Sequence, residues 1–148
     1  YESAGKFKLD SLVASDITAV TTKIVESVKK VNAKRFALDS LTIATMGWKE
    51  RPEEAFKLRS KAFDMLNTLK SLGVTSMIIS EVERSEKPTS SKFGFEEFIV
   101  DSIFHLNYMN IGGASRNMQI LKMRRTDHGK KIYPFDISQS GITIKTLV

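Results

Sequence analysis

Two short apolar runs, each ending in polar residues, constrain the fold of this chain most. The first run, Phe36 to Leu38, is followed by Asp39-Ser40, and the second, residues 74–79, is followed by Ser80-Glu81. The first run is apolar at every position and the second is mostly apolar, which is typical of strands buried on both faces of a parallel sheet. A long segment with helical spacing separates the two runs. The order of strand, helix and strand therefore predicts an α/β fold with a parallel sheet flanked by helices.

Two helices are predicted around the first run. Asp16 is a good N-cap for a helix from Ile17 to about Val31, and Pro52 lies near the start of a second helix that ends at Gly73. Apolar residues recur in both segments at three- and four-residue steps, which is the spacing of one buried helix face. The expected stripes are Ile17, Val20, Ile24, Val28 and Val31, and then Ala55, Leu58, Ala62, Leu66 and Leu69.

The second half of the sequence has a different pattern. Strands are expected at residues 103–108, 117–125, 132–137 and 142–146, with no helix between them and with a turn at Gly112-Gly113. This half is therefore predicted to be an antiparallel extension of the parallel core. A further short strand is expected at residues 6–11, and an exposed loop is expected at residues 84–92.

Composition excludes several classes of protein. The 148 residues fit one domain, and no apolar run approaches the roughly 20 residues of a membrane-spanning helix. The absence of cysteine excludes disulfides and thiolate metal sites, and with only two histidines a histidine-built metal site is not expected. No export signal is recognisable in the first residues, so a cytoplasmic location without membrane association is the default expectation.

The polar residues at the strand ends are the first candidate site. In an open parallel sheet, ligands bind beyond the carboxyl ends of the strands, which is where Asp39-Ser40 and Ser80-Glu81 are expected. An acid that ends a hydrophobic strand has the form of a Walker B element, whose carboxylate helps to hold magnesium beside nucleotide phosphates. The same pattern is also typical of an ordinary acid that ends a strand and caps a loop.

A basic segment is the second candidate site. The net charge is +6, and six cations lie between Arg116 and Lys131 against one acid, Asp127. Within this segment, two-residue spacing places four polar residues on one face while the chain stays extended, with Met123 facing the other way. The four residues are Lys122, Arg124, Thr126 and His128. We expect a phosphate-binding face, because no acid of this chain is expected to pair with the cations. The alternative is a solvated strand face.

Together these segments resemble KaiC-type members of the RecA superfamily, particularly the archaeal KaiC-like ATPases. The resemblance covers nearly all of the chain, in the family's order and spacing. Residues 33–42 resemble its Walker B strand and residues 72–81 its next strand, and three further segments complete the match, at residues 94–101, at 121–128, and at 133–137 followed by Gly141-Ile142.

The resemblance implies a RecA-like P-loop NTPase core that assembles with identical subunits into rings, commonly hexamers, with ATP and Mg²⁺ between neighbours. In that arrangement Asp39 is the metal-associated acid for the ATP of its own subunit, with Ser40 and Glu81 beside the nucleotide. The segment that reaches the neighbour's ATP is matched by Lys122, Met123, Arg124, Thr126 and His128. Arg124 is the implied catalytic finger, and Lys122 is the second catalytic cation beside it.

The departures from the family pattern are also informative. The family's P-loop, Gly-x-x-x-x-Gly-Lys-[Ser/Thr], has no match here, and it is expected to precede this sequence together with the catalytic carboxylate pair. Glu96-Glu97 is interpreted as the first turn of a short helix instead of that pair. Residues 1–148 are thus expected to be a single, N-terminally incomplete domain of an Mg-dependent ATPase. The alternatives are a DNA-binding RecA/RadA-like paralogue, or a regulatory subunit without its own P-loop that acts with a protein partner.

Overall fold

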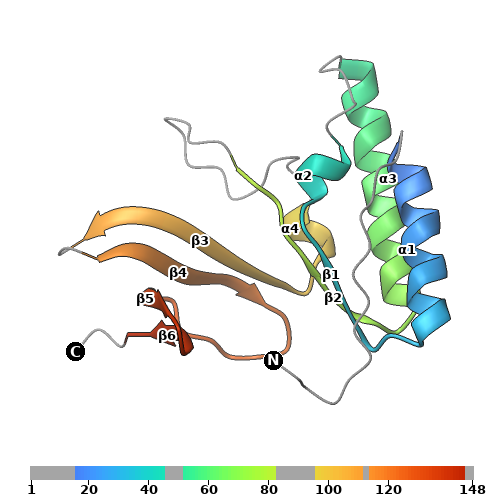
Figure 1. Ribbon diagram of the computed structural model, residues 1–148. Helices are drawn as coiled ribbons and strands as arrows, with labels where there is room; N and C mark the ends of the chain where they lie inside the picture. The colour runs from blue at the N-terminus through green and yellow to red at the C-terminus, as the bar shows by residue number, and fades with distance from the viewer. Residues whose placement is uncertain (1–15, 46–51, 83–95, 112–113, 146–148) are drawn as a thin grey trace. The chain divides into compact units, whose positions relative to one another are not determined.

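The computed structural model describes residues 16–45, 52–82, 96–111 and 114–145 (Figure 1). The chain divides into two compact units, Tyr1–Ile99 and Val100–Val148. The strand expected at 6–11, the loop expected at 84–92 and the turn expected at 112–113 lie outside the described residues.

The described part of the first unit contains four helices and two strands. They are α1 (Ile17–Val31), β1 (Arg35–Leu38), α2 (Leu41–Ala44), α3 (Pro52–Ser71), β2 (Thr75–Ile78) and α4 (Glu96–Ile99). The two long predicted helices are confirmed, and Figure 1 shows α1 and α3 side by side. Glu96 and Glu97 form the first turn of α4, as predicted. No helix within the described ranges has the length and hydrophobicity needed to cross a lipid bilayer.

The hydrophobic core of the first unit lies mainly between α1 and α3. Burying each large apolar side chain contributes about 1.5–3 kcal/mol relative to leaving it exposed, so this stripe-to-stripe contact stabilises the helix pair. The buried apolar residues are Ile17, Val20, Ile24, Val28, Leu38, Leu41, Leu58, Ala62, Met65, Leu66, Leu69 and Ile99. The two predicted stripes are therefore largely confirmed. Gly73 follows the end of α3 and is in the left-handed region, with φ of +64°. Glycine is common in this conformation just after the last turn of a helix.

β1 and β2 form the predicted parallel pair, in which Arg35 lies opposite Thr75 and Leu38 opposite Ile78. The expectation that both strands are buried on both faces is wrong for the described residues. Leu38 is buried and Ile78 packs against the core, whereas Ala37 is exposed and Met77 is 67% exposed. The physical reason is that the helix core covers one face of this two-stranded sheet, so burial alternates along β1, and Ile78 is the residue of β2 that packs against the core.

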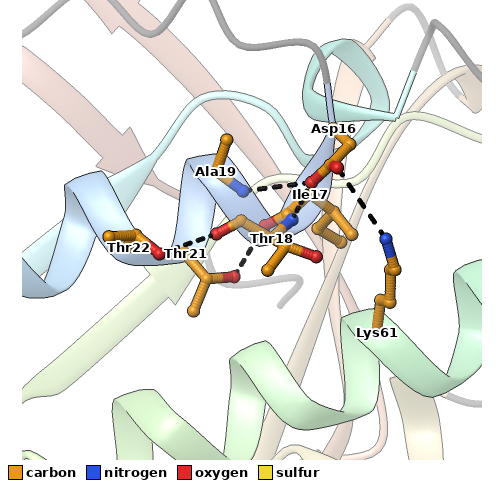
Figure 2. A network of polar contacts seen from close by, with 7 residues as sticks. All are labelled: Asp16, Ile17, Thr18, Ala19, Thr21, Thr22 and Lys61. Carbon is orange, nitrogen blue, oxygen red and sulfur yellow. Dashed lines mark hydrogen bonds and ion pairs between the residues drawn. The ribbon is translucent and has the colours of Figure 1, made fainter.

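The start of α1 is fixed by a side-chain cap, shown in Figure 2. The Oδ1 atom of Asp16 accepts hydrogen bonds from the main-chain N–H groups of Thr18, at 2.6 Å, and Ala19, at 3.0 Å. Lys61 of α3 lies 3.9 Å from the other carboxylate oxygen. The N–H groups of Ala19 and Thr18, helped by Lys61, hold the pKa of Asp16 below its ordinary value. The charged carboxylate therefore stabilises the beginning of α1.

We expect the Asp16→Ala substitution to lower the melting temperature, because two N–H groups at the helix start lose their acceptor. Asp16→Asn, which keeps an acceptor without the charge, is the matched variant. The pKa of Asp16 is lowered in the folded state. The Asp16 charge therefore contributes fully to the free energy of unfolding above the ordinary aspartate pKa, and this contribution is lost as the pH falls through the lowered pKa. The difference in melting temperature between the native protein and Asp16→Asn should therefore shrink on acidification from about pH 6 to about pH 3. A difference that stayed constant over this range would contradict the assigned cap.

The described part of the second unit is an antiparallel sheet in the strand order β3-β4-β5-β6. Its strands are β3 (Ser102–Ile111), β4 (Ala114–Met123), β5 (Ile132–Ser138) and β6 (Gly141–Ile144). The prediction that the second half is antiparallel is confirmed. The β3–β4 pair begins with Ser102 opposite Met123, so the start of β3 lies beside the end of β4. This register places the residues just before Ser102 next to the basic segment.

Candidate functional site

The first candidate site lies at the carboxyl ends of β1 and β2. Because the two strands are parallel, both end at the same edge of the sheet. The N–H of Ile79 donates to the carbonyl of Leu38 at 3.0 Å, and the N–H of Leu41 donates to the carbonyl of Ile79 at 2.8 Å. These bonds hold Asp39-Ser40 beside Ser80-Glu81, as the sequence predicted.

Buried hydroxyl groups fix the backbone of this edge. Ser40 is 1% exposed, and its Oγ atom accepts from the N–H of Ile43 at 3.3 Å as the N-cap of α2. Thr42 is buried as well, and its Oγ1 atom accepts from the N–H of Glu81 at 3.0 Å. The peptide bond between Asp39 and Ser40 is cis. The Ser40 side chain, expected beside a nucleotide, thus supports the turn that carries Asp39.

The side chains at this edge fit a magnesium ion with its phosphates. Asp39 and Glu81 are both exposed, whereas the Oγ atom of Ser80 is buried and has no hydrogen-bond partner within the described residues. Protein-bound Mg²⁺ commonly takes one or two carboxylates and completes its octahedron with phosphate oxygens and water. Among the residues described, no group of three or more Asp, Glu or His side chains could hold a metal. Asp39 is therefore a candidate partial ligand, and the Ser80 hydroxyl is a donor that a phosphate oxygen would satisfy.

The second candidate site lies at the end of β4, and its geometry differs from the prediction. β4 ends at Met123, which is half-buried, and Arg124-Arg125 forms a turn in which Arg125 has φ of +59°. A left-handed residue breaks the alternation of an extended chain. The expectation that Thr126 and His128 share one strand face with Lys122 and Arg124 is therefore wrong. Thr126 is exposed, and the half-exposed His128 has its Nδ1 atom 3.3 Å from the carbonyl of Gly129.

The two expected catalytic cations are held by consecutive residues just before β3. The Nζ atom of Lys122 donates to the carbonyl of Val100 at 2.8 Å, and the N–H of Arg124 donates to the carbonyl of Asp101 at 2.8 Å. In addition, the Nη1 atom of Arg124 lies 3.4 Å from Oδ1 of Asp101. The expectation that no acid of this chain pairs with the basic segment is wrong, because the β3–β4 register brings Asp101 to Arg124. A shallow pocket of about 250 Å³ is lined by Asp101, Arg124 and Arg125.

Sequence reasoning missed Asp101, Arg125 and Thr42 as parts of these sites. Asp101 follows the short helix α4 and directly precedes β3, which is a recognisable position, but only the register shows which cation it meets. Thr42 follows Asp39 by three residues, and its role depends on the neighbouring strand. Arg125 has no local signal, since neither glycine nor asparagine marks the left-handed position.

The family model described as "ATPase: KaiC" matches residues 3–147, which is nearly the whole chain. The chain belongs to the KaiC ATPase family. Among its KaiC relatives are circadian clock oscillator proteins KaiC from two cyanobacteria. The protein of Prochlorococcus marinus is 31% identical over 133 residues, 89% of this chain and 26% of the relative. That of Picosynechococcus is 34% identical over 130 residues, 87% of this chain and 24% of the relative. The chain thus spans about a quarter of the length of these KaiC proteins.

Proposed function

We propose that this chain supplies one part to each of two ATP-hydrolysing sites in a KaiC-type protein that works as a ring of identical subunits. The observation that carries the proposal is the strand-end arrangement, in which Asp39 and Glu81 are exposed at one edge of a parallel pair. Membership of the KaiC ATPase family supports a nucleotide as the ligand there. The two parts act on different ATP molecules, one bound by the same subunit and one bound by the neighbour.

At the strand ends, we assign Asp39 to magnesium and Ser80 and Glu81 to the polar surroundings of the phosphates. A carboxylate is a hard oxygen ligand and suits Mg²⁺, which neutralises charge that develops on the phosphates. The buried hydroxyl of Ser40 and the bond from Glu81 to Thr42 hold the main chain of this edge in place. A fixed edge reduces the reorganisation needed when the metal and nucleotide bind.

At the end of β4, we assign Lys122 and Arg124 to the ATP of the neighbouring subunit. For Met123, Thr126 and His128, a place beside that ATP rests on the family resemblance alone, since the turn at Arg124-Arg125 ends the shared strand face. An ammonium group has three N–H donors and a guanidinium has five, so both can keep their present contacts and still donate to a phosphate. In phosphoryl transfer, an arginine placed at the γ-phosphate stabilises the charge of the transition state. The exposure of the Arg124 side chain, 47%, is compatible with a ligand that arrives from outside this chain.

We predict that the 148-residue chain by itself shows no saturable ATP binding up to millimolar concentrations. No segment of it matches the P-loop, whose main-chain N–H groups and lysine cradle the phosphates. The measurement is a titration with a fluorescent ATP analogue, with the full-length protein that contains this chain as the positive control. The full-length protein should bind the analogue and hydrolyse ATP only with magnesium. Micromolar binding by the chain alone, or absence of magnesium-dependent hydrolysis by the full-length protein, would contradict the proposal.

A further inference from the structure

The segment Val100–Asp101 holds both cations of the basic site, with at least three contacts between them. Two are to main-chain carbonyls, from Nζ of Lys122 to Val100 and from the N–H of Arg124 to Asp101, each at 2.8 Å. The third joins Nη1 of Arg124 to Oδ1 of Asp101 at 3.4 Å and is the only one of the three that uses a side chain of this segment. The position of the Arg124 main chain and the direction of its side chain thus have separate supports.

We propose that Asp101 is a positioning residue for Arg124. This inference rests on the proposed function, in which Arg124 contacts the ATP of a neighbouring subunit. Asp101 holds the guanidinium at the end of β4 before the nucleotide arrives, so that the group does not have to be ordered during the reaction. Asp101 itself does not touch the nucleotide.

The geometry of the pair favours positioning over neutralisation. Both side chains are substantially exposed, 47% for Arg124 and 65% for Asp101, and an exposed pair of this kind is weak. A triphosphate carries several negative charges, so one exposed carboxylate does not compete with it effectively. Nη1 is in contact with Oδ1 of Asp101, and a guanidinium offers five N–H donors in a rigid fork. Arg124 can therefore remain on Asp101 while other donors reach a phosphate oxygen.

The Asp101→Ala substitution isolates the side-chain contact, because it removes the acceptor, whereas the bond from the N–H of Arg124 to the carbonyl of residue 101 does not depend on the side chain. In the full-length protein, we expect kcat to fall about two- to tenfold, the rate equivalent of ordering one long side chain. KM for ATP should change less, because the P-loop and magnesium supply most of the binding. Asp101→Glu should restore part of kcat.

The matched control is Asp136→Ala, because Asp136 is another exposed acid of the same unit and forms an ion pair with Lys145 at 2.6 Å. It should leave kcat unchanged. A crystal structure of the full-length Asp101→Ala variant provides a readout that does not depend on turnover. The Arg124 side chain should leave its position there, while the main chain of β4 up to Met123 stays in place.

The outcomes separate this inference from the proposed function. If Arg124→Ala leaves turnover unchanged, the proposed function fails, and the inference fails with it. If Arg124→Ala abolishes turnover but Asp101→Ala leaves kcat the same or raises it, the proposed function stands and the positioning role is wrong. An equal loss in Asp101→Ala and Asp136→Ala, or an unmoved Arg124 side chain in the variant structure, would also overturn the positioning role.

Discussion

Replacing Arg124 with alanine is expected to lower ATP turnover by the full-length protein by about 10³- to 10⁵-fold, the scale at which arginine fingers act in phosphoryl transfer. The substitution removes a positive charge that we assign to the γ-phosphate of the neighbour's ATP. It should not unfold the sheet, because the main-chain N–H of residue 124 can still donate to the carbonyl of Asp101. The measurement is steady-state phosphate release at saturating ATP and magnesium, with the melting temperature as a check on folding.

The control for this variant is Arg116→Ala. Arg116 is an exposed cation on the same strand, opposite Tyr108 of β3, and has no role in the proposed site. Its removal lowers the net charge by the same amount and should change turnover less than twofold, since surface substitutions away from a site have small effects. Similar losses in both variants would mean that general electrostatic attraction, and not a placed arginine, explains the effect.

The Asp39→Asn substitution is expected to remove magnesium-dependent ATP turnover, with a loss of at least about 10²-fold, as for other preorganised electrostatic groups. The asparagine keeps the shape of the side chain but loses the charge that attracts the ion. Asp39 is exposed, and the edge around it is held by main-chain bonds and by Ser40 and Thr42, so the fold should persist. The measurement is turnover as a function of magnesium concentration, together with circular dichroism.

For this variant, Asp64→Asn is the matched control, because Asp64 is an exposed acid of α3 outside the candidate sites. It should keep the magnesium dependence of the native protein. An Asp39→Asn protein with native turnover at every magnesium concentration would show that Asp39 is an ordinary strand-ending acid.

Local signals explain why much of the fold could be predicted. Asp16 lies directly before a run with helical apolar spacing, and it caps a helix with the bounds Ile17–Val31 that were expected. The two apolar runs are strands, and the helix between them is the usual crossover connection of adjacent parallel strands. Each of these predictions depends on residues within one segment, or on the order of segments.

The parts that could not be predicted depend on geometry that local patterns do not encode. Two-residue spacing places Thr126 and His128 on the face of Lys122 only while φ stays extended, and the left-handed Arg125 ends that condition without a glycine to mark it. The pairing of Arg124 with Asp101 spans 23 residues and follows from the β3–β4 register. The exposure of Met77 depends on what covers the second face of the sheet, about which the sequence of one strand contains no information.

The central claim is that Arg124 of one subunit acts on ATP bound by another, and mixing two inactive variants tests it most directly. One variant has Arg124→Ala with an intact P-loop, and the other has an intact Arg124 with its P-loop lysine removed. Co-purification through a tag on one variant verifies that mixed rings form. We predict that each variant is inactive alone and that mixed rings recover part of the turnover, because some interfaces then combine a working P-loop with a working arginine. Mixed rings that remain as inactive as either variant alone would contradict the claim and would show that Arg124 does not act across the interface.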